Sequence, residues 1–284
     1  MRGSLKNVLA NKLKPEELSL LYKSYDVVGD IAVIRIPESL EPLSRIIAEA
    51  IMQTHKRVRT VLRQVSPISG DFRVRKLEWV RGERKTVTFH KEFGCIFKVD
   101  LEKCYFSPRL SHERMRIAKL VKPNETIVNM FAGVGCYSII IAKHSEAKEI
   151  FSIDINPVAV QCIQENTELN KAGERVFPLE GDAKRIVEEK LRNVANRVLM
   201  PLPEKAYKYL NSAVLALKPT GGWISYYEFE HARKDENPVE KTKRKVFEKL
   251  QNFNVNFEIP FGRIVRTTGP NWYQVVIDIE VFPK

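Results

Sequence analysis

The sequence predicts an α/β fold in which a small α+β domain, residues 1–91, precedes a larger domain, residues 92–284, built on a mostly parallel sheet. Up to about Lys103, short helical patterns are mixed with segments of alternating polar and apolar residues, which are typical of antiparallel strands. After this point apolar strands and helices follow each other in turn, as in a parallel sheet. A chain of 284 residues is long enough for one large and one small domain, each with its own core.

Composition favours a cytoplasmic protein without a metal site. Hydrophobic residues make up 44% and charged residues 29%, and no apolar run approaches the length of a membrane span, so no membrane partner is expected. The four cysteines form no C-x-x-C pair and only five histidines are present, which argues against zinc and for reduced thiols.

The net charge of +12 is unevenly distributed. Residues 1–91 contain 18 Lys and Arg against 10 Asp and Glu, and 11 of these basic residues lie between Lys56 and Lys91. Such a surface attracts a polyanion by releasing counterions. A solvated surface rich in ion pairs is the alternative. The one-sided charge favours nucleic acid as the partner of this domain.

The first domain is expected to hold two short helices, a strand, a longer helix and three strand segments, in that order. The helices are KNVLANKL and KPEELSLLYKSY, the strand VVGDIAVIRIP ends at Pro37, and the longer helix begins behind Pro42. The alternating segments are VRTVLRQV, FRVRKLEWVRGE and RKTVTFHKEFGCIFKVDL.

The first strand of the second domain leads into a glycine turn and a helix, ETIVNMFAGVGCYSIIIAKH. Gly133 and Gly135 let the backbone approach a ligand at the carboxyl edge of the sheet. The next strand ends in Asp154, where a carboxylate can accept hydrogen bonds from both ribose hydroxyls of a nucleoside. A third strand ends in Gly181-Asp182, from which a side chain can reach an adenine edge.

A fourth strand, RVLMPLP, stops at a proline, and VNFEIPFGRIVRTTGPNWYQVVIDIEVF predicts a terminal antiparallel pair that completes a seven-stranded sheet. The turn is Phe-Ala-Gly-x-Gly and lacks the third glycine of a dinucleotide fingerprint, which argues against a dehydrogenase. The ordered motifs at four strand ends fit S-adenosylmethionine better. This is the sheet of class I methyltransferases.

Several motifs resemble the archaeal and eukaryotic tRNA guanosine-37 N1-methyltransferase family, whose close relatives act in the wyosine pathway. They are YFSPRLSHERMRIAKLV, VNMFAGVGCYSI, IDINPVAV, ENTELNK, GDAKRIV and YYEF. The resemblance extends from about Gly29 to the end. It implies S-adenosylmethionine as cofactor, the anticodon loop of tRNA as substrate and a monomer. Members often carry a further N-terminal domain that grips the tRNA elbow, and at this length the chain is expected to lack it.

The resemblance also implies roles for individual residues. The cofactor-binding residues would be Phe131, Ala132, Gly133, Gly135, Asp154, Ile155, Asp182 and Ala183. The substrate-binding residues would be Tyr105, Arg109, Arg114 and Pro203. Glu113 would be the general base, Arg73 would lie near the guanine oxygen, and Pro201 would shape the catalytic pocket.

Elementary chemistry agrees with these roles. Guanine N1 carries a proton at neutral pH, so its attack on a methyl sulfonium needs a base, and a buried glutamate with a raised pKa is competent. A guanidinium stabilises the negative charge left on O6. The residues alone leave alternatives: Glu113 as a surface ion pair, Arg73 as a phosphate contact, and Tyr105 as core.

Pro201 stands in MPLP, where MNLP is the commoner family form. Proline replaces an amide that would hold the edge of guanine by an apolar wall. We therefore expect a relaxed pocket that accepts guanosine 37 and also 4-demethylwyosine, methylated at C7. A strand terminator is the structural alternative.

Two other functions remain open at this point. One is transfer of the aminocarboxypropyl group of the same cofactor to the wyosine precursor in tRNA-Phe, although the arginine and glutamate of FSPRLSHER fit methyl transfer better. The other is an RNA-binding module that has lost catalysis, against which the intact cofactor motifs argue.

Overall fold

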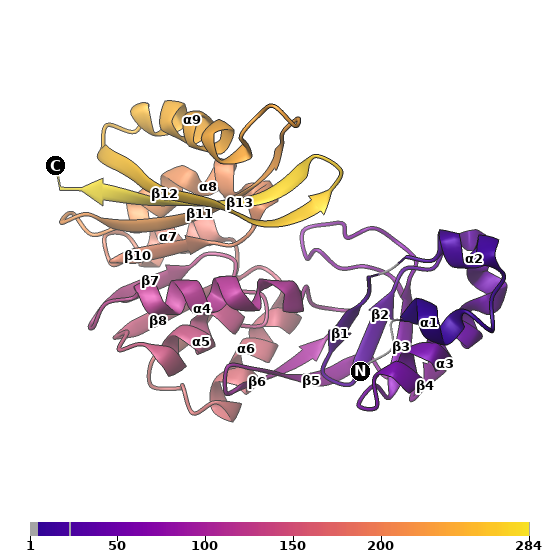
Figure 1. Ribbon diagram of the computed structural model, residues 1–284. Coiled ribbons are helices and arrows are strands. Elements are labelled where there is room, and N and C mark those ends of the chain that lie inside the picture. The colour runs from indigo at the N-terminus through magenta and orange to yellow at the C-terminus, as the bar shows by residue number, and fades with distance from the viewer. Residues whose placement is uncertain (1–4, 23, 284) are drawn as a thin grey trace. The chain divides into compact units, whose positions relative to one another are not determined.

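A computed structural model describes residues 5–22 and 24–283 of the chain. They form two compact units, Met1–Arg109 and Leu110–Lys284, which are described separately (Figure 1). The sequence analysis places the boundary after residue 91, within a strand of the hairpin that closes the first unit. The division at Arg109 keeps this hairpin whole, because its two strands pair only with each other.

The first unit contains a four-stranded sheet, in the order β1-β2-β3-β4, and a separate two-stranded hairpin. The sheet strands are β1 (Asp26–Val28), β2 (Ile31–Ile34), β3 (Thr60–Gln64) and β4 (Leu77–Gly82), and the hairpin strands are β5 (Val87–Glu92) and β6 (Cys95–Asp100). The helical segments are α1 (Leu5–Leu9), α2 (Pro15–Leu20), η1 (Glu38–Leu43), α3 (Ser44–Thr54) and η2 (Pro108–Leu110). The strands β2 and β3 are parallel, and α3 makes the crossover between them.

The expected single strand VVGDIAVIRIP is wrong: the segment forms the antiparallel pair β1 and β2. The chain reverses at Gly29, whose φ is +56°, a left-handed value that favours glycine. A Cβ at this position would lie 2.1 Å from Oγ1 of Thr88. The turn therefore packs closely against β5, a contact that the local pattern could not reveal.

The core of the first unit lies between α3, α1 and the sheet. On α3 the buried residues Ile47, Ala48 and Ile51 form the apolar face expected of an amphipathic helix. They belong to one cluster with Leu9 and Val61. The helix behind Pro42 begins as a 3₁₀ segment, and α3 itself starts at Ser44.

The second unit is built on a seven-stranded sheet, which confirms the predicted α/β fold. Its order is β12-β13-β11-β10-β7-β8-β9, in which β13 pairs antiparallel with both β12 and β11 and all other neighbouring pairs are parallel. The strands are β7 (Thr126–Asn129), β8 (Glu149–Asp154), β9 (Val176–Glu180), β10 (Arg197–Met200), β11 (Gly222–His231), β12 (Asn256–Gly269) and β13 (Trp272–Phe282). The predicted terminal antiparallel pair is thus also confirmed.

Helices cover both faces of this sheet (Figure 1). One face carries α4 (Ser111–Leu120), α5 (Cys136–His144) and α6 (Pro157–Leu169), and the other carries α7 (Ala183–Lys190), α8 (Pro203–Ala216) and α9 (Pro238–Gln251). The strand order reverses between β7 and β10, so the carboxyl ends of these strands flank the position where open α/β sheets bind ligands. None of the described helices combines the length and apolar character needed to cross a membrane.

Candidate active site

The turn after β7 brings backbone close to the carboxyl edge of the sheet. Gly133 and Gly135 have φ values of +55° and +87°, in the region that favours glycine. The N–H of Gly135 donates to the carbonyl of Ala132 at 3.0 Å. A Cβ at Gly135 would lie 3.3 Å from side-chain carbons of Ile139 and Ile163, so the turn packs against α5 and α6. Larger residues would push the turn outward.

Asp154 ends β8 and is held beside this turn. Its Oδ2 accepts the N–H of Gly133 at 2.7 Å, and its Oδ1 accepts the N–H of Asn156 at 2.9 Å. Each carboxylate oxygen retains a second lone pair for a further donor. Burial raises the pKa of Asp154, although these backbone hydrogen bonds oppose the shift. The carboxylate is therefore oriented, and able to accept two hydroxyl groups.

We expect the affinity for a nucleoside cofactor held by Asp154 to fall in acidic solution. Accepting two ribose hydroxyls requires the ionised form of Asp154, and the raised pKa moves protonation of the ligand-free protein to a higher pH than usual for aspartate. Affinity should be constant above this pKa and decline as the pH falls through it. Calorimetric titrations across a pH series check this. A matched series with Asp154→Asn should lack the decline.

Apolar side chains flank the site formed by the turn at Gly133 and the carboxylate of Asp154, which we call the cradle. Ile155, directly after Asp154, is 39% exposed, whereas Ala183 at the start of α7 is buried. Phe131 is half-buried and packs edge-to-face against Tyr209, with the ring centroids 5.3 Å apart. An exposed isoleucine and a fixed aromatic ring beside a carboxylate suit the flat base and the ribose of a nucleoside.

Asp182 is first of all the N-cap of α7. Its Oδ1 accepts the N–H groups of Lys184 at 2.9 Å and Arg185 at 3.2 Å, and its Oδ2 accepts the hydroxyl of Tyr209. A contact with an adenine edge would have to share Oδ2 with Tyr209. The sequence predicts that this carboxylate lies where a strand ends, but its role as the N-cap of α7 was not expected.

The segment after β10 supplies no polar side chain. Pro201 directly follows Met200, the last residue of β10, and is half-buried. Pro203 is buried at the first turn of α8, where its fixed φ suits a helix start. The structure thus gives both prolines a backbone role, and their expected contact with substrate remains a proposal.

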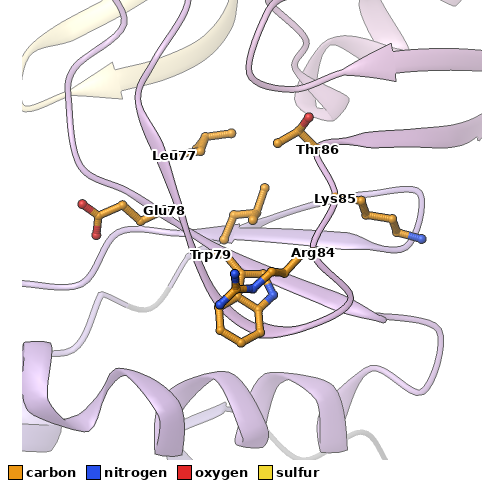
Figure 2. A pocket seen from close by; sticks show the side chains of 7 residues that line it. Leu77, Glu78, Trp79, Arg84, Lys85 and Thr86 are labelled. Atoms are coloured by element: carbon orange, nitrogen blue, oxygen red, sulfur yellow. The ribbon is translucent and has the colours of Figure 1, made fainter.

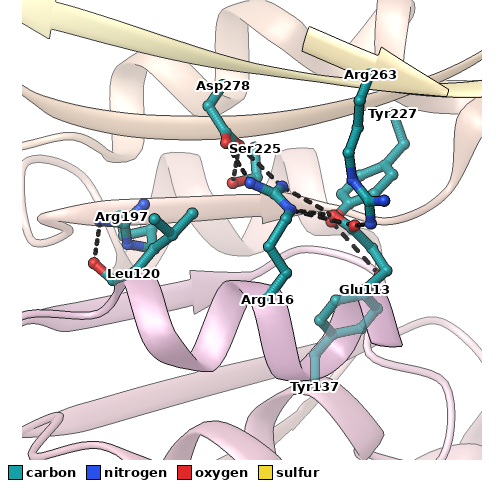
Figure 3. Close-up of polar contacts among 9 residues, drawn as sticks. All are labelled: Glu113, Arg116, Leu120, Tyr137, Arg197, Ser225, Tyr227, Arg263 and Asp278. Atoms are coloured by element: carbon teal, nitrogen blue, oxygen red, sulfur yellow. Dashed lines mark hydrogen bonds and ion pairs between the residues drawn. The ribbon is translucent and has the colours of Figure 1, made fainter. Parts of the chain in front are cut away.

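Glu113 lies in the first turn of α4 at the centre of a buried polar cluster (Figure 3). Its side chain is 1% exposed and accepts hydrogen bonds from the hydroxyl of Tyr227 at 2.8 Å and from Nη2 of Arg116 at 2.8 Å. Arg263, on β12, forms an ion pair with the other carboxylate oxygen. Glu113 is therefore not the solvated surface ion pair that its sequence neighbours allowed.

Asp278 completes this cluster from β13. It pairs with Nη1 of Arg116 at 2.5 Å and accepts the hydroxyl of Ser225 at 2.8 Å. Burial alone would lower the pKa of Arg116, but its bonds to Asp278 and Glu113 outweigh burial and raise it. Burial also raises the pKa of Tyr227 well above its ordinary value, so this phenol remains a neutral donor. The negative charges of Glu113 and Asp278 thus balance the positive charges of Arg116 and Arg263 within this cluster.

The remaining predicted residues lie in different surroundings. In the first unit the guanidinium of Arg73 stacks 4.6 Å from the ring centroid of Tyr105, so the structure brings these two together. Arg109 is 48% exposed and pairs with Asp26 at 2.7 Å. Arg114, next to Glu113 on α4, is only 3% exposed. The Arg114 side chain is thus less accessible to a substrate than expected.

The sequence indicates Arg116 as an ion-pair partner of Glu113 on the same helix, but not Tyr227 and Arg263, which also bind Glu113, nor Asp278, which binds Arg116. A signal for Asp278 was present, because a lone acidic residue interrupts the apolar run VVIDI of β13. Tyr227 belongs to the YYEF motif, which was noted without a role. Within residues 5–22 and 24–283, no three His, Cys, Asp or Glu side chains gather as metal ligands.

Comparison with known families gives two matches that together cover most of the chain. Residues 88–256 match the TRM5/TYW2 methyltransferase domain, and residues 5–86 match the TYW2 N-terminal domain. The two matches meet near residue 87, at the start of β5.

Individual proteins are similar over nearly the whole chain. The tRNA (guanine(37)-N(1))-methyltransferase Trm5b of Pyrococcus abyssi is 39% identical over 94% of this chain and 78% of its own. The tRNA 4-demethylwyosine(37)-methyltransferase Taw21 of Saccharolobus solfataricus is 37% identical over 92% of this chain and 94% of its own. A solved complex of aTrm5 and tRNALeu superposes with a TM-score of 0.84 at 36% identity, covering 99% of this chain and 79% of that one.

Proposed function

The chain belongs to the TRM5/TYW2 methyltransferase family, and we propose that it transfers a methyl group from S-adenosylmethionine to N1 of guanosine 37 in the anticodon loop of tRNA. The observation that supports this proposal is the Asp154 carboxylate bound to the glycine turn at the carboxyl edge of the sheet, in the same unit as the buried Glu113 carboxylate. The residues at the strand ends would bind the cofactor. The Glu113 carboxylate would be the base that takes the proton from the ring nitrogen.

The residues at the strand ends fit this cofactor. Asp154 would accept the two ribose hydroxyls, Ile155 and Phe131 would contact the adenine ring, and the turn at Gly133 would allow close approach of the backbone. When bound, S-adenosylmethionine supplies a methyl group on a sulfonium sulfur, which a ring nitrogen can attack.

Glu113 would accept the proton of guanine N1 as the new N–CH₃ bond forms. Tyr227 and Arg116 hold the carboxylate in place from the protein interior. Arg263, whose side chain is 38% exposed, reaches it from β12, so this ion pair is the contact that a substrate base would displace. Arg73, which stacks on Tyr105, has the guanidinium proposed to stabilise the charge on O6.

The proline at position 201 supports a second substrate. The chain is 39% identical to a guanosine-37 enzyme and 37% identical to a 4-demethylwyosine enzyme, so overall similarity favours neither activity strongly. Without a side-chain amide at the end of β10, the pocket lacks a contact that selects guanine. We propose that the protein also methylates C7 of 4-demethylwyosine in tRNA.

Pro201→Asn is expected to retain methylation of guanosine 37 and to lose most activity on the tricyclic base, because it restores a polar contact to the guanine edge and narrows the pocket. Rates on unmodified tRNA and on tRNA containing 4-demethylwyosine measure the ratio. Pro219→Ala, in the exposed turn before β11, is the control and should leave the ratio unchanged. If the wild type leaves 4-demethylwyosine unmodified at high enzyme concentration, Pro201 is a strand terminator.

The test of the main proposal is incubation with labelled S-adenosylmethionine and unmodified tRNA, followed by mass spectrometry of the nucleosides. We expect 1-methylguanosine at position 37. On tRNA that carries the wyosine precursor, an adduct with the mass of the aminocarboxypropyl group would support the transferase alternative. If the protein binds the cofactor but forms no product, methyl transfer is contradicted. If it neither binds the cofactor nor forms a product, the RNA-binding module is the function that remains.

We further propose that the protein acts as a cytoplasmic monomer. The four cysteines are buried free thiols, and reduced thiols are typical of cytoplasmic proteins. Light scattering of the purified protein with and without tRNA measures its mass and checks the oligomeric state.

A further inference from the structure

Two neighbouring cavities of the first unit share Lys85. The smaller, of about 600 Å³, lies beside Trp79 and Arg84, and Figure 2 shows the Arg84 guanidinium over the indole ring. The larger, of about 1240 Å³, is lined by Lys56, Arg57 and the exposed side of β5 among others. We call the surface formed by Lys56, Arg57, Trp79, Lys85, Phe89 and Lys91 the β5 face.

The β5 face exposes apolar and basic side chains because of strand alternation. Val87, Phe89 and Lys91 point to the exposed side of β5, whereas Thr88 and Glu92 are buried. The Phe89 side chain is 54% exposed. Phe89 thus presents an exposed flat ring beside Lys91, two residues further along the same side of the strand.

The basic side chains of this face differ in how well they are neutralised. Lys85 is paired with Asp30 at 2.6 Å and with Glu83 at 2.8 Å. Lys56, Arg57 and Lys91 are exposed, and within the described parts of the chain they form no ion pair. Their three charges are therefore available to an anionic ligand.

Other parts of the basic stretch are already compensated. Arg63 is only 13% exposed and is held by Glu41 at 2.9 Å and by Glu78 at 2.5 Å. Arg59 and Arg81 also have acidic partners, Glu83 and Glu49 respectively. Between Lys56 and Lys91, four basic residues thus have carboxylate partners, namely Arg59, Arg63, Arg81 and Lys85, whereas Lys56, Arg57 and Lys91 of the β5 face have none among the described residues.

Trp79 adds a second flat surface. Its indole nitrogen donates to the carbonyl of Gly82 at 3.2 Å, which fixes the ring at the edge strand β4. The guanidinium of Arg84 lies 4.7 Å from the centroid of the ring (Figure 2). The same ring, still 38% exposed, offers space to a planar group. Fixed aromatic rings beside free cations are the combination with which proteins bind single RNA strands.

We propose that the β5 face binds a single-stranded segment of the tRNA substrate, with phosphates at Lys56, Arg57 and Lys91 and bases stacked on Phe89 and Trp79. This rests on the proposed function only for the identity of the RNA. A single nucleic acid strand carries both phosphates and flat bases, and the β5 face carries both unpaired cations and exposed aromatic rings. Neither an acidic protein nor a membrane surface offers phosphates and flat bases together.

The test compares two triple variants that remove the same number of positive charges. The first neutralises the unpaired cations of the β5 face, Lys56→Gln, Arg57→Gln and Lys91→Gln. The second neutralises exposed residues of the first unit outside both cavities, Lys12→Gln, Lys14→Gln and Arg45→Gln. Binding of unmodified tRNA to the full chain is measured over a series of salt concentrations.

The first triple is expected to reduce the slope of log affinity against log salt by about two to three, since each phosphate contact contributes about 0.7–0.9. The second should leave the slope near that of the wild type. Phe89→Ala should weaken binding by about tenfold at every salt concentration without changing the slope, because stacking releases no counterions.

An unchanged slope in the first triple, or an equal loss in the second, would show that the β5 face is an ordinary solvated surface. Melting curves verify that each variant is folded. Wild-type methyl transfer is measured separately. If the wild type transfers the methyl group but the first triple variant keeps the wild-type slope, only the proposal for the β5 face is wrong. If the first triple variant has a reduced slope but the wild type transfers no methyl group, only the proposed function is wrong.

Discussion

Glu113→Gln is expected to lower the single-turnover rate of methyl transfer by roughly two to four orders of magnitude, with little change in cofactor affinity. An amide keeps the size of the carboxylate, and its oxygen can still accept from Arg116 and Tyr227, but its nitrogen cannot accept from Arg263 and the amide cannot take up the N1 proton. Rapid-quench measurement with enzyme in excess over tRNA isolates this step from product release. The ribose contact is assigned to Asp154, so calorimetry with S-adenosylmethionine should give nearly the same affinity.

A loss of rate could also follow from a disturbed fold, because Glu113 is buried and bonded to two guanidiniums. Asp278→Asn is the matched control. It removes the other carboxylate that holds Arg116 and leaves Glu113 itself intact. Both variants should melt at lower temperature, but only Glu113→Gln should lose the chemical step. An unchanged single-turnover rate in Glu113→Gln, or equal losses in both variants, would remove Glu113 from the role of base.

Asp154→Ala is expected to weaken S-adenosylmethionine binding by about a hundredfold or more. Two hydrogen bonds from ribose hydroxyls to a carboxylate are lost, and each such bond contributes about 1.5–3 kcal/mol. The variant also frees the N–H of Gly133, so the turn after β7 loses its fixed position. Calorimetry measures the affinity directly, and the rate at saturating cofactor should fall much less than the affinity.

Asp182→Asn provides the comparison for this second prediction. Asparagine is as good an N-cap as aspartate, so α7 should remain intact, and binding should fall far less than in Asp154→Ala. Equal losses would mean that both carboxylates contact the cofactor. If Asp154→Ala binds the cofactor as tightly as the wild type, Asp154 does not contact it.

Local pattern was sufficient to predict the sheet and the edge at which open α/β sheets bind ligands. Apolar strands, glycine turns and helix starts recur along residues 126–216 in an order that only an open α/β sheet accommodates. The place of Asp154 follows from the same order, because the last residue of a parallel strand must lie at the carboxyl edge. In the first domain the pattern was less informative, because the segment on both sides of the turn at Gly29 was expected to form a single strand.

The surroundings of Glu113 came only from tertiary structure. Arg263, on β12, lies 150 residues beyond Glu113, and Asp278, on β13, lies 162 residues beyond Arg116. Pairing of these two strands at the end of the sheet brings both side chains to α4. The neutralisation of Arg63 by Glu41 and Glu78 likewise needs a helical segment and a neighbouring strand. Sequence periodicity determines which face of an element is buried. Which charge meets which is decided by packing between elements, because electrostatic energy depends on distance in space and not along the chain.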